Sequence, residues 1–326
     1  MGAAGSRVIA ALLLLGAAPL AAQSPITVLT EPAEPVGGSL FRLTVGGAPP
    51  GELRGVLAGE PLHFHAGRRG STALAALPLD GARAGALTLI IRRPNGSPDT
   101  VSRSLPGREA SRPAERLRVA PRFAEPDTAA TRRIEGEVAE ARAIARAAHG
   151  TPRLWTAPFL PPRPGRVTSS FGGGRTFNGR VLSRHLGTDF AGAVGAPVRA
   201  SNRGVVALVA DFYLAGHAVY IDHGEGITTG YFHLSRGLVQ AGDTVARGQI
   251  IGRVGQSGRV TGPHLHWTAR YGELQVDPLS LLRVSRRPAA SVRPRRISAA
   301  RQGPAARPSD PPCPGSASSP ARQRRP

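Results

Sequence analysis

The chain has 326 residues and a formal net charge of +21, and all 42 of its basic residues are arginines. This length predicts about two domains. A single cysteine, Cys313, excludes a fold held by intramolecular disulfides, so stability has to come from packing or from a bound metal. The charge favours anionic partners of any kind, although an all-arginine basic set is also what a GC-rich genome produces.

Residues 1–22 have the pattern of a secretory signal peptide. Arg7 precedes an apolar run that starts at Val8, and the small residues Ala21 and Ala22 offer a cleavage site. The run is about 15 residues long, whereas a membrane-spanning helix needs about 20. We therefore expect export to the periplasm, cell envelope or extracellular space, with no transmembrane helix in the mature form. An uncleaved membrane anchor is the alternative.

Residues 25–105 contain short runs of β-forming residues separated by Gly, Pro and Asn. This spacing predicts a small antiparallel β-sandwich of the immunoglobulin-like type, with Asn95-Gly96 at a hairpin tip. No catalytic pattern occurs there, and we expect His63 and His65 on a solvated strand face. The domain could bind cell-wall polymer, cover an active cleft or act as a spacer, and the sequence does not rank these roles.

Residues 106–150 are expected to form a linker and one helix. The linker, 106–127, is rich in Pro, Arg and Glu. Asp127 and Thr128 can cap a helix that runs to about His149 and stops at Gly150. The spacing of apolar residues predicts that one face carries Ile134, Val138, Ala141 and Ala145.

Residues 151–283 are again glycine-punctuated strands with almost no helical periodicity, which predicts a mostly antiparallel all-β domain. Residues 284–326 hold ten arginines against one aspartate and almost no large apolar residue, so we expect a disordered tail. The tail is expected to attract anionic envelope polymers. We expect no nucleic-acid binding, because no aromatic residues interleave with these arginines.

The candidate chemistry lies in histidine-containing motifs of the second β region. His264 and His266 in TGPHLHW share one strand face, but LHFH, with His63 and His65, has the same spacing, so the pair alone decides nothing. His185 and Asp189 in SRHLGTD could converge where a loop enters a strand. Together with one histidine of HLH they would give two imidazoles and a carboxylate, the donor set of catalytic zinc, and the expected reaction is hydrolysis of a polarised carbonyl.

The order of these motifs resembles the lysostaphin/LytM-type zinc metallopeptidases, which are bacterial peptidoglycan endopeptidases. The matching stretches are His185-x-x-x-Asp189, Tyr231-x-His233-Leu234-Ser235 and Gly262-Pro263-His264-Leu265-His266-Trp267, and the similarity covers residues 166–282. It extends through SSFGGGR, GTDFAGAVGAPVRAS, VYIDHGEG, AGDTVARGQIIGRVGQSG and VDPLSLL.

The resemblance implies an antiparallel sheet domain of the LytM type, similar to a duplicated hybrid motif. It implies that one zinc ion is held by His185, Asp189 and His266, that His233 and His264 are catalytic, and that the substrate is the cross-linked peptide of peptidoglycan. Relatives that have lost ligands act as non-catalytic regulators of cell-wall amidases, which is the alternative function. Which histidine is the general base stays open, with His264 preferred and His233 assigned to the oxyanion.

Five further histidine and aromatic residues are expected to have structural roles. We expect His149 to interact with a helix C-terminus and His217 to lie at a hairpin tip. The remaining three, His223, Tyr231 and Trp267, are expected to pack in the core or in the cleft wall.

Overall fold

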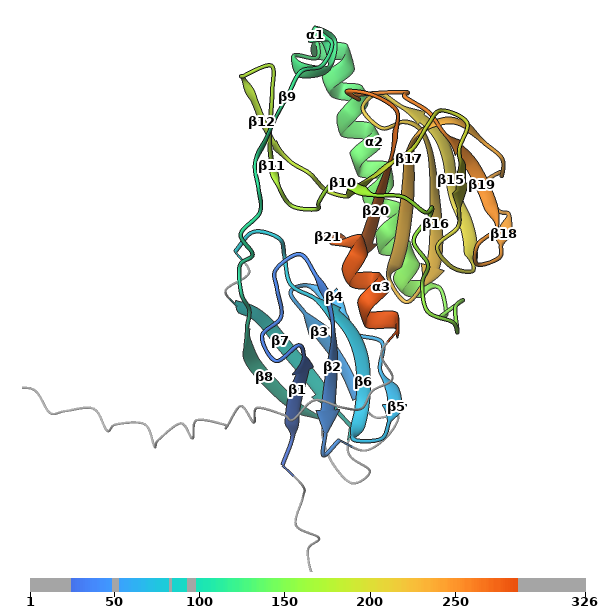
Figure 1. Ribbon diagram of the computed structural model, residues 1–326. Coiled ribbons are helices and arrows are strands. Elements are labelled where there is room, and N and C mark those ends of the chain that lie inside the picture. Colours follow the sequence, from blue (N-terminus) through green and yellow to red (C-terminus); the bar gives the residue numbers. More distant parts are fainter. Residues whose placement is uncertain (1–24, 49–52, 82–83, 93–97, 287–326) are drawn as a thin grey trace, which may run out of the picture. The chain divides into compact units, whose positions relative to one another are not determined.

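The computed structural model describes residues 25–48, 53–81, 84–92 and 98–286 (Figure 1). The expected signal peptide, the Asn95-Gly96 tip and most of the expected tail lie outside these residues. The described chain is mostly β, as the sequence predicts, with sheets in its N-terminal and C-terminal parts. Over the described ranges, no helix is both long enough and apolar enough to cross a bilayer.

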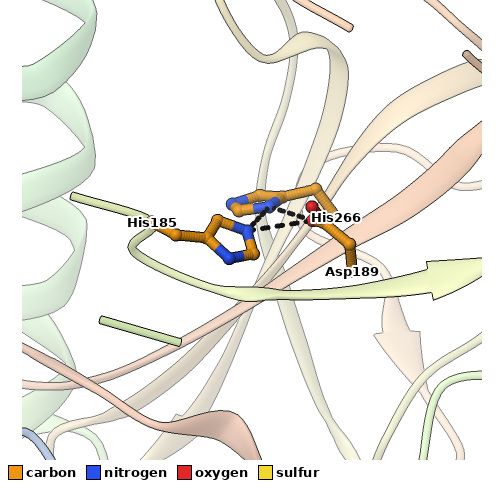
Figure 2. Close-up of side chains that lie close together, drawn as sticks. All are labelled: His185, Asp189 and His266. Carbon is orange, nitrogen blue, oxygen red and sulfur yellow. Dashed lines mark hydrogen bonds and ion pairs between the residues drawn. The ribbon is translucent and has the colours of Figure 1, made fainter. Parts of the chain in front are cut away.

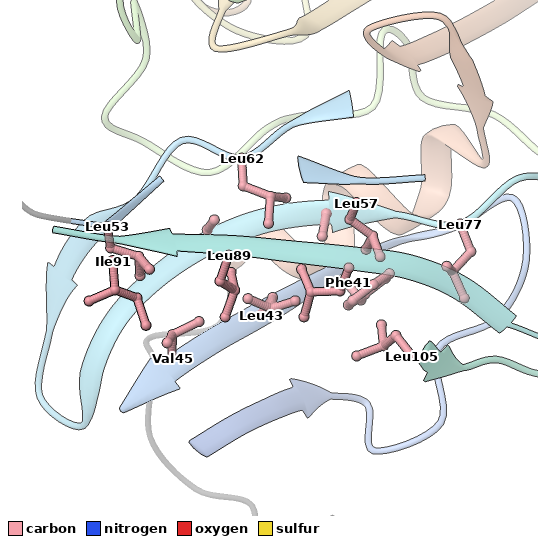
Figure 3. Close-up of a cluster of buried hydrophobic side chains, with 13 residues drawn as sticks. Phe41, Leu43, Val45, Leu53, Leu57, Leu62, Leu77, Leu89, Ile91 and Leu105 are labelled. Atoms are coloured by element: carbon pink, nitrogen blue, oxygen red, sulfur yellow. The ribbon is translucent and has the colours of Figure 1, made fainter. Parts of the chain in front are cut away.

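The strands before residue 107 form two four-stranded antiparallel sheets, with orders β1-β2-β6-β5 and β4-β3-β7-β8. Alternate side chains of β3 and β7 are buried, because a strand presents successive residues to opposite faces. Buried residues from both sheets share one cluster, which includes Phe41 and Leu43 of β2 and Leu89 and Ile91 of β7 (Figure 3). The bounds are β1 Thr27–Glu31, β2 Leu40–Gly46, β3 Leu53–Leu57, β4 Glu60–Pro61, β5 His65–Gly67, β6 Gly70–Ala76, β7 Ala84–Ile91 and β8 Asp99–Pro106.

The predicted helix is confirmed as α2, Thr128–Ala147, followed by a 3-10 turn, Ala148–Gly150. The Asp127 carboxylate caps it by accepting a hydrogen bond from the Ala130 amide at 2.8 Å. The residues of the predicted apolar face differ in burial: Ala141 and Ala145 are buried, but Val138 is 43% exposed. Alanine is the residue that packs because its small side chain lets the helix approach the aromatic residues of the sheet beneath it.

The linker before this helix contains regular structure that the sequence did not reveal. It holds a short strand, β9, Glu115–Leu117, and one helical turn, α1, Pro121–Ala124. The strand pairs in parallel with β11, Gly174–Phe177, which also pairs with β12, Val181–Arg184. Segments about 60 residues apart are therefore hydrogen-bonded side by side.

The C-terminal part is a ten-stranded sheet in which all pairs are antiparallel. Its main order is β10-β13-β20-β17-β16-β15-β18, while β19 pairs with β14 and β17, and β21 pairs with β20. The bounds are β10 Val167–Ser169, β13 Thr188–Ala191, β14 Pro197–Arg199, β15 Gly204–Phe212, β16 Gly216–Gly224, β17 Ile227–Gly237, β18 Thr244–Val245, β19 Ile250–Val254, β20 His264–Tyr271 and β21 Leu274–Val276.

A short helix, α3, Pro278–Arg286, follows the sheet and corrects the expected start of the tail. The composition predicts disorder from residue 284, but Val284 is helical and only 8% exposed. Leu281, one turn earlier, is fully buried. Two apolar residues three apart suffice to fix one helical turn against a core, although they are too few to give a periodic pattern.

Three residues expected to pack are confirmed in the core of this sheet, where His223, Tyr231 and Trp267 are fully buried. His223 Nδ1 donates to the Arg203 carbonyl at 2.8 Å, and its Nε2 lies 2.8 Å from the Thr229 hydroxyl. Burial lowers the pKa of His223 from 6.5 to about 4, and the Arg203 hydrogen bond offsets part of this effect. The imidazole is therefore neutral in the folded protein at pH 7.

Protonation of His223 should make the fold sensitive to acid. The unfolded chain takes up this proton near pH 6.5 and the folded chain only near pH 4, so the stabilisation is complete above 6.5 and is lost as the pH falls toward 4. From pH 7 to pH 4 this group should reduce the free energy of unfolding by about 3 kcal/mol. Urea denaturation at stepped pH should show a weaker pH dependence for His223→Gln, and identical pH profiles would contradict the assignment.

Candidate metal centre and cleft

Three side chains expected to be metal ligands lie together at one end of the sheet (Figure 2). His185 Nε2 is 3.0 Å from Asp189 Oδ1 and 3.0 Å from His266 Nδ1, and His266 Nδ1 is 2.7 Å from Asp189 Oδ1. Ligand atoms of a tetrahedral zinc ion lie roughly 3 Å from one another, since each is about 2.0–2.1 Å from the metal. Two imidazole nitrogens and one carboxylate oxygen at these separations fit one small divalent cation.

Sheet register brings these ligands together. Asp189 on β13 lies directly opposite His266 on β20, so the two side chains are cross-strand neighbours. His185 enters from the loop before β13. Gly187 lies in this loop between His185 and Asp189. A Cβ at Gly187 would lie 2.6 Å from His266 Cε1 and 2.7 Å from the Trp267 carbonyl oxygen. Glycine is therefore required for the loop to approach the ligand set this closely.

Backbone carbonyls fix the tautomer of three histidines in the cleft. His185 Nδ1 lies 2.8 Å from the Ser170 carbonyl, His233 Nδ1 2.8 Å from that of Ser257, and His264 Nδ1 2.8 Å from that of Gly262. A carbonyl oxygen only accepts, so each Nδ1 carries a proton, and in the neutral form of the ring each Nε2 keeps its lone pair. His185 Nε2 is thereby prepared to bind a metal ion. The same atom of His233 and of His264 is prepared to accept a proton.

The two histidines expected to be catalytic lie beside the ligand set. The His233 and His264 ring centroids are 4.9 Å apart, and His264 Nε2 is 3.7 Å from Asp189 Oδ1. His233 has a backbone φ of 60°, a left-handed conformation that non-glycine residues rarely adopt, and its amide donates to the Ala215 carbonyl. Residues held in such strained conformations cluster at functional sites.

Electrostatics set the charge states that a metal site needs. Burial acts to raise the pKa of Asp189, but His266 and His185 outweigh it and the net pKa is lowered, so the carboxylate is ionised. Burial lowers the pKa of His266 to about 4, although Asp189 opposes this shift. Burial also places the pKa of His233 well below 6.5, and His266 and His264 add to the shift. The carboxylate of Asp189 therefore carries a negative charge near pH 7, whereas the imidazoles of His266 and His233 are neutral.

A cavity of about 570 Å³ contains the ligand set and both neighbouring histidines. Its wall includes Ile134 and Val138 of α2, the two residues of the predicted apolar face that are not fully buried. Their exposure is therefore a feature of the cleft and not of the core. An open, partly apolar cleft beside a candidate metal site has room for a peptide segment.

A hydrogen-bond network that no sequence motif indicates holds His185 and Asp189 on the side away from the other ligand atoms. Arg175 Nη2 donates to Asp189 Oδ2 at 2.7 Å, on the oxygen opposite the ligand set, and its Nε donates to Glu115 Oε2 at 2.9 Å. Ser169 Oγ donates to Glu115 Oε1 at 2.5 Å and lies 3.0 Å from His185 Nδ1. Glu115 thus neutralises a guanidinium beside the site and closes a ring that orients both His185 and Asp189.

The position of Glu115 in the sequence explains why it was missed. It lies on β9 in the linker, directly opposite Arg175 in the parallel β9–β11 pair. Arg175 was visible as the last residue of SSFGGGR, but nothing local to the linker signals the pairing. A three-residue strand is too short to give a pattern, so only the tertiary fold reveals it.

The expectations for four histidines outside the cavity, His63, His65, His149 and His217, are only partly met. His63 is not on a solvated face, because its Nε2 lies 2.9 Å from Nδ1 of His149, whose Nε2 is 3.0 Å from a carboxylate oxygen of Glu60. His65 is more exposed and pairs with Glu225. His217 lies beside a hairpin turn and pairs with Asp211, as expected for a tip residue. Side-chain partners far away in sequence replace the helix-end role expected for His149.

Comparison with known proteins places the site in a family. Residues 183–278 match the model of peptidase family M23. This C-terminal segment is an M23 peptidase segment. It contains the three candidate ligands and both neighbouring histidines, whereas Glu115 and Arg175 lie outside it.

The chain is similar over part of its length to known bacterial endopeptidases. Over 86 residues the chain is 50% identical to the peptidoglycan DD-endopeptidase ShyA of Vibrio cholerae, a match that covers 26% of this chain and 20% of ShyA. Over 97 residues it is 45% identical to the DD-carboxypeptidase/endopeptidase Mpg of Neisseria meningitidis, covering 30% of this chain and 22% of Mpg. The matched part of the chain spans only about a fifth of the length of these relatives.

A solved structure shares more of the chain. A peptidase M23 crystal structure from Pseudomonas aeruginosa is 28% identical with a TM-score of 0.60, and the match covers 77% of this chain and 96% of the other. This coverage exceeds that of the M23 segment. The similarity therefore extends beyond residues 183–278 to other parts of the chain.

Loss of the Glu115 charge should weaken metal binding. Glu115→Gln keeps the side-chain volume but leaves the Arg175 charge beside a dication uncompensated, so zinc affinity should fall about tenfold, the lower end of the range for outer partners of metal ligands. Competition with a chelating dye measures the affinity, and circular dichroism checks the fold.

The matched control is Glu125→Gln. Glu125 belongs to the same linker and pairs with Arg180 of the β11–β12 turn at 3.0 Å, but both side chains are exposed and neither reaches the site. This variant should bind zinc like the wild type. Equal losses in the two variants would show that a loosened linker, and not the Glu115 charge, is responsible.

Proposed function

We propose that this protein is an exported, zinc-dependent endopeptidase that hydrolyses amide bonds of peptidoglycan cross-links in the cell envelope. The observation that carries the proposal is the convergence of His185, Asp189 and His266 within 3.0 Å beside two histidines whose Nδ1 atoms are each held by a backbone carbonyl. The similarity of the M23 segment to DD-endopeptidases supports this substrate. The proposal assigns the C-terminal sheet to the LytM type, similar to a duplicated hybrid motif, and the N-terminal sheets to an immunoglobulin-like sandwich.

In this proposal His185, Asp189 and His266 hold the ion. Zinc bound there supplies Lewis-acid chemistry, which polarises the scissile carbonyl. The protein supplies the remaining functions: neutral imidazoles to ligate, a single carboxylate charge to balance the dication, and a cleft that positions the peptide. Arg175 keeps Asp189 Oδ2 occupied, so only Oδ1 faces the ion.

His233 and His264 are assigned to proton transfer and to stabilisation of the oxyanion. Each Nδ1 is committed to a backbone carbonyl, so each Nε2 can accept a proton and return it to the leaving amine nitrogen. We assign the general base to His264, whose Nε2 lies 3.7 Å from Asp189 Oδ1. His233, held by its Ser257 and Ala215 contacts, is assigned to the developing oxyanion, to which its Nε2 donates only while that atom carries a proton.

The alternative, a non-catalytic regulator of amidases, has less support. A scaffold requires neither a complete ligand set nor histidines in the tautomer for proton transfer, and this chain has both. Attraction of the arginine-rich residues 284–326 to anionic envelope polymers stays a prediction, as does the absence of nucleic-acid binding.

Three substitutions separate metal binding from turnover. Asp189→Ala and His266→Ala should lose zinc and activity together, because each removes a ligand. His264→Ala should keep zinc and lose about 10²- to 10⁴-fold in turnover, the usual contribution of a general base. Metal content by mass spectrometry and digestion of defined cross-linked muropeptides, with products identified by mass, provide both measurements.

His217→Ala is the control, since His217 is exposed and lies outside the cavity. It should retain zinc and turnover. Equal metal loss in the Asp189, His266 and His264 variants would overturn the assignment of roles, and a wild-type protein that binds no zinc and releases no peptides would overturn the function.

A further inference from the structure

The acidic residues that line the cavity are already committed to other partners. Glu115 pairs with Arg175, Asp189 belongs to the ligand set, and both carboxylate oxygens of Glu137 accept from the Tyr213 amide at 2.9 Å. No carboxylate of the described cavity wall is left to balance a further positive charge.

Arg259 supplies such a charge. Its side chain lines the cavity with its guanidinium carbon 4.1 Å from the centre of the Phe177 ring. To the described residues, this side chain makes no hydrogen bond and no ion pair, whereas the cavity residue Arg184 pairs with Asp80. Burial lowers the pKa of Arg259 to about 10, and the positive charge of Arg175 adds to the shift. A partly buried cation without a counter-charge is costly and gains from an anionic partner.

Arg259 occupies the loop that orients both catalytic histidines. In this loop, residues 255–263, the Ser257 carbonyl accepts from His233 and the Gly262 carbonyl accepts from His264. Arg259 lies between these two positions and is the only charged residue of the loop. Its own amide donates to the Leu214 carbonyl at 2.8 Å, which fixes the backbone there. A substrate group bound by Arg259 would therefore be held by the same loop that orients both histidines.

We propose that Arg259 binds a free carboxylate of the substrate next to the scissile amide and so selects cross-links that carry one. A guanidinium with one face on an aromatic ring keeps its edge free, and its planar fork matches a carboxylate with two parallel hydrogen bonds. The inference rests on the proposed peptidase function and adds the chemistry by which this cleft recognises its peptide. Arg259 is a specificity residue, distinct from the ligands and from the two histidines.

The test uses the full zinc-loaded chain and two synthetic cross-linked peptides. They are identical except that the residue supplying the scissile nitrogen carries a carboxylate in one and a carboxamide in the other. The wild type should cleave the carboxylate peptide with a kcat/KM about 10- to 100-fold higher, the range expected for hydrogen bonds between charged groups. Arg259→Met, which can still pack on Phe177, should lose this preference by slowing only the carboxylate peptide.

Two further variants sharpen the result. Arg184→Met, a cavity arginine already paired with Asp80, should keep the wild-type preference. Arg259→Lys keeps the charge but not the fork, and should retain part of the preference. Equal slowing of both peptides by Arg259→Met would indicate a purely structural residue and overturn the inference, as would a wild type without preference.

A measurement of peptide binding tests the role of Arg259 independently of the proposed peptidase activity. Calorimetry with both peptides on the His264→Ala protein reports recognition without turnover. A carboxylate preference in binding that disappears in His264→Ala/Arg259→Met supports the inference even if the wild type cleaves neither peptide, an outcome that would overturn only the proposed peptidase. Equal binding of the two peptides overturns the inference whatever the wild type cleaves.

Discussion

The division of the Asp189 carboxylate between two sets of partners is the interaction on which the site depends. Oδ1 faces His185 and His266, while Oδ2 accepts from Arg175. A carboxylate that used both oxygens toward a metal would change the coordination number, and one without the arginine would be free to rotate. Buried as it is, the group requires every one of these partners, because an unpaired charge in that position costs several kcal/mol.

This division makes the site depend on a segment far from the catalytic motifs. Arg175 is held by Glu115, and Glu115 is placed by the pairing of β9 with β11. The linker is consequently part of the cleft and not a passive connection. It also leads into α2, whose Val138 lies in the cavity wall. The candidate ligands come from the M23 segment, but Arg175, Glu115 and part of the cavity wall come from outside it.

The negatively and positively charged side chains of the cleft have different kinds of partner. The acidic side chains of its described wall are paired, and Arg259 contributes a positive charge whose described neighbour is an aromatic ring. In the proposed function, this arrangement would leave a dication to act on the carbonyl and a guanidinium to act on an anion of the same peptide. Rate and selectivity would then be set by different residues, which is how a shared catalytic centre can serve different substrates.

The sequence by itself determined the all-β character, the α2 helix with its Asp127 cap and the identity of the five cleft residues. These features are local: strand alternation, a capping side chain, and motifs in which a few adjacent residues carry the chemistry. The tertiary structure alone decided that His63 meets His149, that Val138 and Arg259 line a cavity, that α3 includes Val284, and that Glu115 holds Arg175. Each depends on strand pairing or packing between residues far apart in sequence, and no local pattern encodes which distant partner a side chain will find.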